Sequence, residues 1–162
     1  MDHVDTVIEQ WNKERGDLNV AAMATIGRVM RLSIIFGREM EKTFNRFNLH
    51  MASFDVLATL RRSGTPYALS PGDLIASTMV TSGTMTNRID QLEKAELITR
   101  TKSETDKRSV LIALTDAGFE LIDKVIEEHV KTQQQLTANL SDQERGGLDA
   151  ILRKMTHHFE NP

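Results

Sequence analysis

The sequence of 162 residues predicts a mainly α-helical fold with one small β-hairpin, built as a single domain. Two observations support this fold class. Apolar residues recur at helical spacing through most of the chain. Two β-prone runs, Leu97-Ile98-Thr99-Arg100 and Ser109-Val110-Leu111-Ile112-Ala113-Leu114, lie between helical segments and are joined by a charged loop. Glycine and proline are too sparse for a flexible linker between domains.

The N-terminal residues predict two helices. Residues 1–16 form a short amphipathic segment, in which Val4, Val7, Ile8 and Trp11 follow helical spacing. Residues 17–48 form a helical pattern longer than one small core requires. The C-terminal residues 115–162 add two more helices, the first capped by Thr115 and the second by the capping box Ser141-Asp142-Gln143-Glu144. The surplus apolar surface of these terminal helices implies a partner.

A third helix is predicted from His50 to Arg62. Apolar residues occupy nearly every side of this segment, so it must be buried. Asp55 lies at its centre. A carboxylate there is costly to bury unless it is paired.

The residues from Leu69 to Thr115 predict a helix, a turn, a second helix and a hairpin. Ser70 suits the cap of the first short helix and Pro71 its first position. The turn runs from Met79 to Gly83, and the second helix from Thr84 to Lys94. This order describes a winged helix-turn-helix, in which the loop 101–108 forms the tip of the wing.

The second helix has an apolar face and a polar face. Helical spacing places Met85, Ile89 and Leu92 together, opposite small hydrogen-bonding residues and the charged Asp90 and Lys94. Such small side chains let a helix approach base edges in the major groove of double-stranded DNA, although a polar face can also be merely solvated. A guanidinium at the wing tip suits a narrow minor groove. The candidate DNA-binding residues are Ser82, Gly83, Thr84, Thr86, Asn87, Lys102, Asp106, Lys107 and Arg108.

Composition restricts the other functional classes. The absence of cysteine excludes disulfides, thiolate zinc sites and thiol-based redox sensing. No apolar run approaches the ~20 residues that span a bilayer, and no leader is visible, so a cytoplasmic protein without a membrane partner is expected. The formal charge is −3, but residues 81–114 carry six basic and five acidic groups, whereas residues 115–162 carry five and nine. Total charge therefore decides nothing about DNA binding.

Several segments resemble the MarR family of transcriptional regulators. They are Thr81-Ser82-Gly83-Thr84-Met85-Thr86-Asn87-Arg88, Leu92-Glu93-Lys94, Asp106-Lys107-Arg108-Ser109 and Leu114-Thr115-Asp116-Ala117-Gly118. The resemblance implies a homodimer, whose dimerisation helices are residues 17–48 and 115–162. It also implies a winged helix-turn-helix at 49–114 and a pseudo-palindromic operator. One residue departs from the family pattern: Glu96 occupies a turn position where glycine is usual.

A second group of candidate residues lies outside the DNA-binding elements or beside them. Trp11, Asp55, Arg88 and Arg100 combine one carboxylate, two guanidinium groups and the single indole of the chain. From the residues alone, Asp55 and the arginines could equally form a structural salt-bridge network. The segments around Trp11, Asp55 and Leu60-Arg61-Arg62-Ser63-Gly64 resemble the urate-responsive, HucR/PecS-like branch of the family, with 1–16 as its extra N-terminal helix.

That resemblance implies that Trp11, Asp55, Arg88 and Arg100 bind a purine effector. A planar anion would accept a guanidinium fork and an indole contact. We therefore predict a ligand-responsive repressor that leaves its operator when urate or a related purine binds. The alternatives are a regulator that responds to phenolic or other aromatic anions, and an architectural DNA-binding protein without an effector. An enzyme and a cofactor are not expected. A metal site at His157, His158 and Glu160 is not expected either, because the two adjacent histidines point to different sides of a terminal helix.

Overall fold

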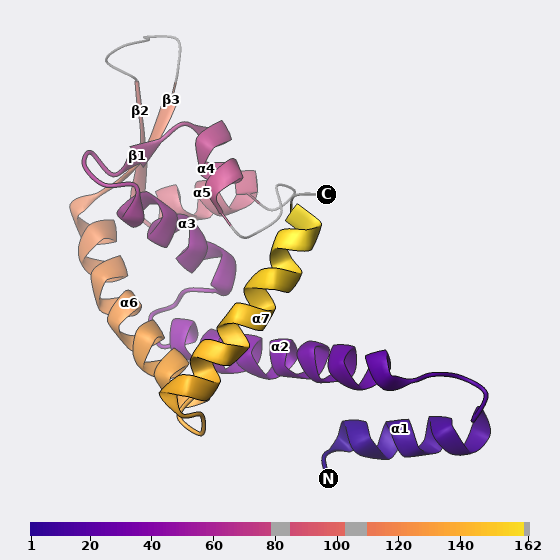
Figure 1. Cartoon of the computed structure of the whole chain (residues 1–162). Coiled ribbons are helices and arrows are strands. Elements are labelled where there is room, and N and C mark those ends of the chain that lie inside the picture. The colour runs from indigo at the N-terminus through magenta and orange to yellow at the C-terminus, as the bar shows by residue number, and fades with distance from the viewer. Residues whose placement is uncertain (79–84, 103–109, 161–162) are drawn as a thin grey trace. The chain divides into compact units, whose positions relative to one another are not determined.

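The computed structural model describes residues 1–78, 85–102 and 110–160, and the chain divides into two compact units, residues 1–42 and 43–162 (Figure 1). Helix α2 (Ala21–Asn45) begins in the first unit and ends in the second. The single domain assigned from the sequence stays a prediction.

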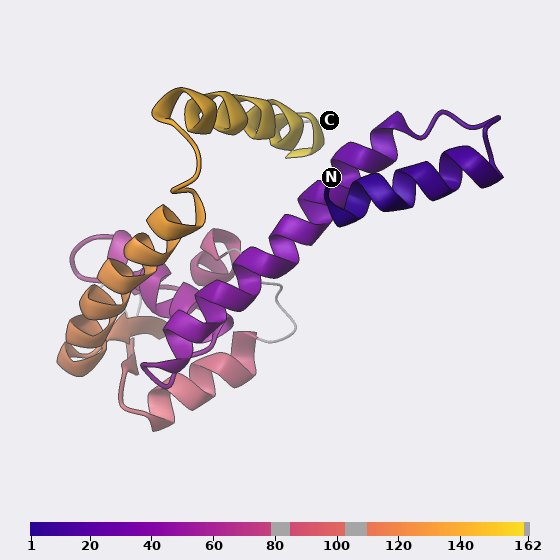
Figure 2. The same ribbon diagram turned by 90° about the horizontal axis from the view of Figure 1, so that it is seen from below.

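The first unit is a pair of helices. Helix α1 (His3–Glu14) is capped by Asp2, whose carboxylate accepts from the backbone N–H of Val4 at 2.8 Å. Helix α1 runs back alongside α2 in both views (Figures 1 and 2). Arg28 of α2 donates to Asp2 at 2.8 Å and also pairs with Asp5, so two carboxylates join the helices. The hydrogen bond from Arg28 lowers the pKa of the Asp2 carboxyl, because it favours the charged form. The pKa of the Asp5 carboxyl is lowered by the hydrogen bond from the Asp2 N–H and then by the one from Arg28.

The second unit packs helices around a small sheet. Its helices are α3 (Met51–Arg62), α4 (Pro71–Ser77), α5 (Met85–Lys94), α6 (Asp116–Leu136) and α7 (Asp142–Glu160). No residue from Met51 to Arg61 is exposed, which confirms the predicted burial of α3. The core side chains with relative exposure of 5% or less include Val56, Leu57, Leu60, Leu74, Met85, Ile89, Leu92, Ile98, Ile112, Ile122 and Val125.

The sheet has three antiparallel strands in the order β1-β3-β2. The strands β2 (Ile98–Lys102) and β3 (Val110–Leu114) confirm the two predicted runs. The strand β1 (Ala68–Leu69) was not predicted. It has only two residues, which pair with Ala113 and Ile112, and two residues are too few to show the alternation by which a strand is recognised.

Arg61 of α3 joins three elements of the second unit. Its guanidinium lies 4.4 Å from the ring centre of Phe119 and 5.2 Å from that of Tyr67, the residue before β1. It also donates to Asp123 of α6 at 2.6 Å. The two hydrogen bonds to Asp123 raise the pKa of Arg61. Stacking and charge pairing together fasten the sheet and α6 to α3.

The caps predicted for the last two helices are confirmed. The Thr115 hydroxyl accepts from the N–H of Gly118 at 3.0 Å, at the start of α6. The Ser141 hydroxyl accepts from the N–H of Glu144 at 3.3 Å, and the Glu144 carboxylate accepts from the Ser141 N–H at 2.8 Å. These hydrogen bonds lower the pKa of Glu144. Every residue of α7 is described, and none of them is buried.

The turn from α5 to β2 is closed by a left-handed residue. Glu96 has φ of 58°, the conformation that favours glycine. The Leu97 N–H donates to the Leu92 carbonyl at 3.0 Å and the Glu96 N–H to the Glu93 carbonyl at 2.9 Å. This pair of hydrogen bonds is a Schellman motif. Glu96 therefore forms the turn at which the resemblance predicted glycine.

Candidate nucleic-acid interface

Helix α5 presents the two faces expected from the sequence. Met85, Ile89 and Leu92 are buried against the core, with relative exposures of 1%, 5% and 3%. Thr86 and Asn87, in the first turn of the described helix, are both exposed. The apolar residues therefore fix the helix, and two small hydrogen-bonding side chains remain accessible to a partner.

The predicted interface is only partly described. Lys102 ends β2 and is exposed. The other predicted DNA-binding residues lie outside the described residues: Ser82, Gly83, Thr84, Asp106, Lys107 and Arg108. The described part of the interface thus consists of Thr86, Asn87 and Lys102.

Helix α4 is held at both ends. The Ser70 hydroxyl accepts from the N–H of Asp73 at 3.1 Å, which confirms the predicted cap, and Pro71 is the first helical residue. At the other end Arg62 of α3 donates to the carbonyl of Ser77 and, at 3.0 Å, to the Thr59 hydroxyl. An arginine near the last carbonyls of a helix satisfies groups that have no partner within the helix. Arg62 therefore positions the end of α4 that leads toward α5.

The two arginines assigned to an effector both interact with α5. Arg88 is half-buried and donates to Gln91 at 3.0 Å. Within the described part of the chain, its Nε is buried and has no hydrogen-bond partner. Arg100, on β2, pairs with Asp90 at 2.5 Å and with Glu93. Arg100 therefore neutralises two carboxylates of α5.

Trp11 and Asp55 lie in different units. Trp11 is in α1 of the first unit, and its side chain is 42% exposed. Asp55 lies in α3 of the second unit, as do Arg88 and Arg100 in α5 and β2. Asp55 is half-buried. A common site for the four residues stays a prediction.

The pairing of Arg100 with Asp90 and Glu93 was not predicted. Asp90 was expected on the polar face of the second helix, and Asp55 was the carboxylate partner expected for the arginines. The available signal was the spacing: Asp90 and Glu93 are three residues apart and lie just before the strand that carries Arg100. Residues at this spacing share one side of a helix.

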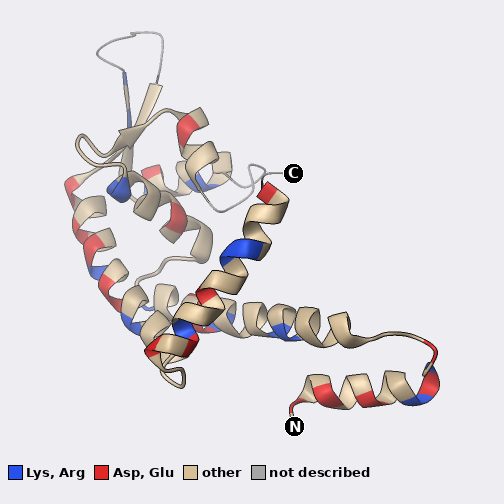
Figure 3. Cartoon of the chain, in the orientation of Figure 1, with Lys and Arg blue, Asp and Glu red and all other residues tan. Residues whose placement is uncertain are grey.

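The charged side chains differ between the elements of the second unit (Figure 3). Helix α6 carries Asp116, Glu120, Asp123, Glu127 and Glu128, and Figure 3 shows acidic residues along its length. The acidic excess of the C-terminal residues thus lies on α6 and α7 rather than on α5 and β2. In α6, burial lowers the pKa of His129, which favours its neutral form near pH 7.

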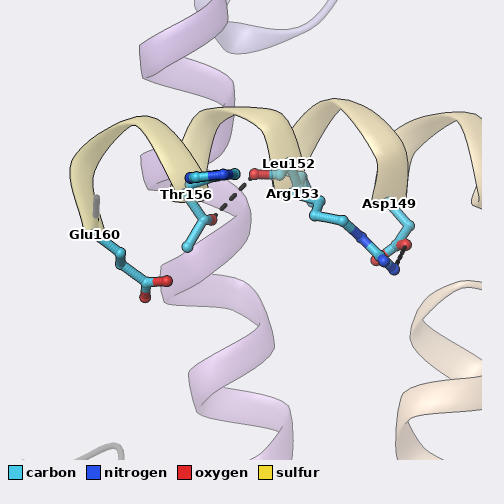
Figure 4. A pocket seen from close by; sticks show the side chains of 6 residues that line it. Asp149, Leu152, Arg153, Thr156 and Glu160 are labelled. Carbon is cyan, nitrogen blue, oxygen red and sulfur yellow. Dashed lines mark hydrogen bonds and ion pairs between the residues drawn. The ribbon is translucent and has the colours of Figure 1, made fainter. Parts of the chain in front are cut away.

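Two surface hollows are lined by residues other than the four assigned to an effector. One, of about 410 Å³, is lined by α7 alone, and its Arg153 pairs with Asp149 at 2.8 Å (Figure 4). The other, of about 290 Å³, lies between α1 and α2 and is lined mainly by apolar residues such as Val4, Val7 and Ile8. Among the residues that the structure describes, no three His, Asp or Glu side chains are grouped to hold a metal ion.

Proteins of known family are similar to this chain in sequence. A model of the MarR family matches residues 49–110. The HTH-type transcriptional regulator PecS of Dickeya dadantii is 41% identical over 158 residues, which cover 98% of this chain and 95% of PecS. The chain belongs to the MarR family. This MarR family member is therefore a DNA-binding transcriptional regulator rather than an enzyme.

Solved structures of MarR regulators have the same fold. BpsR of Bordetella bronchiseptica, described in connection with regulation of its DNA binding by 6-hydroxynicotinic acid, has a TM-score of 0.71 and 26% identity, over 80% of this chain and 91% of BpsR. A mutant MarR of E. coli complexed with operator DNA has a TM-score of 0.72 and 24% identity, over 84% of this chain and 96% of that one. The second similarity shows the fold alone. None of the helices described in this MarR family chain is long and apolar enough to cross a membrane.

Proposed function

We propose that this MarR family regulator is a homodimeric repressor that leaves its operator when urate or a related purine binds to Trp11, Asp55, Arg88 and Arg100. The observation that carries the proposal is the buried Nε of Arg88, which has no hydrogen-bond partner among the described residues. An unpaired buried donor is costly. An anionic heterocycle with several acceptors would satisfy it.

The other three residues supply complementary chemistry. The Trp11 indole is accessible for a stacking contact with a planar ring. Arg100 offers a guanidinium that can exchange its partners Asp90 and Glu93 for an anion, because all three side chains are partly exposed. The half-buried Asp55 would repel the anion, or it would compete with the anion for Arg88 or Arg100. Either event changes the charges that face α5.

A homodimer is supported by apolar side chains that lie exposed on α2 and α7. Ile34 is 63% exposed in α2, and Ile151 and Phe159 are 61% and 75% exposed in α7. Large apolar side chains at this exposure are typical of an interface. A second copy that covers these helices would also set two α5 helices for a pseudo-palindromic operator. Sedimentation should give about twice the chain mass of 18.3 kDa, and a monomer at micromolar concentration would contradict the dimer.

For DNA, we propose that Ser82, Gly83, Thr84, Thr86 and Asn87 contact the major groove, whereas Lys102, Asp106, Lys107 and Arg108 belong to the wing contact. Replacing Arg108 with alanine should then weaken operator binding by roughly 1–3 kcal/mol, because a charge-assisted groove contact is lost.

The experiment measures release of operator DNA against urate concentration, at fixed salt and pH. The operator is a duplex that the protein selects from random sequences. The parent should release it, while Trp11→Phe and Arg100→Ala should need more urate. Trp11→Phe should bind DNA like the parent without urate, since Trp11 lies in neither reading element. If both variants release DNA at the same urate concentration as the parent, the assignment of these residues to the effector site is wrong.

A second candidate effector is an aromatic carboxylate. BpsR, at 26% identity, has DNA binding regulated by 6-hydroxynicotinic acid. Such an anion could also use the Arg88 and Arg100 guanidiniums. Titration with 6-hydroxynicotinate beside urate and xanthine distinguishes the two candidates, because the true effector releases DNA at the lowest concentration. Release by none of them would favour a regulator without these effectors.

A further inference from the structure

Arg100 binds two acidic residues that lie next to each other on the DNA-reading helix. Its Nη2 donates to Asp90 Oδ1 at 2.5 Å, and its Nη1 donates to Glu93 Oε2. Asp90 and Glu93 are three residues apart on α5, where like charges repel. A single guanidinium thus neutralises two carboxylates that would otherwise add negative charge to α5.

The position of these acids matters because of what precedes them. Asp90 follows Thr86 by four residues and Asn87 by three, so it lies one turn further along the exposed side of α5. Operator DNA presents a dense array of phosphates on both sides of the groove. Unneutralised carboxylates one turn from the base-reading residues would therefore repel it.

We propose that Arg100 is an electrostatic switch: paired with Asp90 and Glu93 it screens their charge from DNA, and an anion that takes its guanidinium removes that screen. The second part rests on the proposed function, since it requires an anionic effector at Arg100. The screening itself does not. It is a positioning and charge-neutralising role, distinct from a direct contact between Arg100 and DNA.

The exposure of the three side chains separates this role from a purely structural one. Arg100, Asp90 and Glu93 are 35%, 49% and 37% exposed. Ion pairs at such exposure contribute little to folding stability. Loss of the pairs should therefore leave thermal unfolding almost unchanged while it changes the affinity for DNA.

Screening also predicts competition. An anion and the two carboxylates would use the same Nη atoms of Arg100. Removing both acidic charges should tighten anion binding, because the guanidinium no longer has to leave its partners. A network that merely held α5 in place would loosen when cut, and it would bind the anion no better than before.

The first test measures operator affinity without effector, at low and high salt, for four proteins besides the parent. These are Arg100→Gln, the pair Asp90→Asn with Glu93→Gln, the triple variant, and Glu96→Gln. The last is the charge-matched control, because no described residue pairs with the Glu96 carboxylate. Thermal unfolding checks that each variant is folded.

Arg100→Gln should bind operator about tenfold more weakly at low salt, with a smaller loss at high salt, where exposed charges are screened. The triple variant should regain the parent's affinity, because the acids that needed screening are gone. Glu96→Gln should resemble the parent. If the triple variant binds as weakly as Arg100→Gln, Arg100 acts on DNA directly and the screening proposal is overturned.

The second test measures urate binding without DNA, by fluorescence of Trp11. The pair Asp90→Asn with Glu93→Gln should bind urate about tenfold more tightly than the parent, by loss of a competing charge pair. Equal or weaker urate binding would show that urate does not compete with Asp90 and Glu93 for Arg100. If the parent binds no urate, the proposed effector is wrong, and the operator measurements alone then decide the screening.

Discussion

The two ends of helix α5 are built differently. Its first described turn carries Thr86 and Asn87, both exposed. Its C-terminal end is closed by the left-handed Glu96 and by the backbone hydrogen bond from the Leu97 N–H to the Leu92 carbonyl. The Thr115 hydroxyl, at the start of α6, donates to the Glu96 carbonyl at 2.7 Å. One end is therefore presented to a partner, while the other is fastened to the wing and to α6.

The difference between the two ends indicates which of them sets the orientation of α5. A DNA-reading helix must place its side chains to a fraction of an ångström, and such precision comes from rigid support. The support lies at the end away from Thr86 and Asn87. Changes to the backbone turn and its hydrogen bonds at the fastened end should therefore alter stability, whereas changes to Thr86 and Asn87 at the exposed end should alter DNA binding alone.

The largest effect is expected for Gly118→Ala. A Cβ at Gly118 would lie 1.9 Å from the carbonyl oxygen of Leu97, so backbone must move. The free energy of unfolding, measured in urea, should fall by about 3 kcal/mol, the upper end of ordinary overpacking. The control is Gly147→Ala in α7, where no atom lies within 4 Å of the added Cβ. It should gain ~0.5–1 kcal/mol. Equal urea midpoints for Gly118→Ala and the parent would contradict rigid support at the C-terminal end of α5.

Asn87→Ala tests the exposed end. It should lose about 1–3 kcal/mol of discrimination between the operator and duplexes with single base changes, as expected when a base contact is removed. Its unfolding free energy should stay within ~0.5 kcal/mol of the parent, because the side chain is exposed. Binding to the set of duplexes at one salt concentration measures this. An unchanged order of base preferences would show that Asn87 does not read DNA.

Thr115→Ala removes two hydrogen bonds at the fastened end. The hydroxyl caps α6 at the N–H of Gly118 and holds the Glu96 carbonyl. The expected loss is about 1 kcal/mol in urea unfolding, typical of a lost cap. Thr115→Ser keeps the hydroxyl and should retain most of the stability. A serine variant as unstable as the alanine variant would assign the loss to the methyl group instead.

The smallest change expected is a gain. Glu96→Gly should stabilise the protein by ~0.5–1 kcal/mol, because glycine adopts a positive φ without the clash of a Cβ. Glu96→Ala is the control, since it removes the carboxylate but keeps the Cβ, and it should show no such gain. If both substitutions stabilise equally, the charge of Glu96 rather than its backbone conformation is responsible.

Local features of the fold were predictable from the sequence. The caps at Ser70, Thr115 and Ser141 and the apolar face of α5 depend on residues within a few positions of one another, so their patterns are visible in the chain. The strand β1 was missed because it exists only through pairing with β3. No local pattern distinguishes its two residues from a loop.

The candidate site was predictable in its residue types but not in its pairings. Arg88 and Arg100 were both predicted as binding residues, and the structure finds Arg88 half-buried. The partners of Arg100 depend on how the chain turns between α5 and β2. That turn relies on a left-handed glutamate, which the sequence pattern alone treats as an exception. The contacts Arg100–Asp90 and Arg100–Glu93 are consequences of this turn.

The coupling between urate and operator DNA is measured most directly by a urate titration with and without saturating operator. The fluorescence of Trp11, the only tryptophan, reports the binding of urate. Coupling between two ligands is reciprocal. If urate releases DNA, bound operator must weaken urate binding by the same factor, typically about 5–150-fold. Trp11→Phe, which lacks the indole, supplies the fluorescence blank. The operator-bound protein should therefore bind urate more weakly than the free protein. Equal urate affinity in the presence and absence of operator would contradict a urate-responsive repressor.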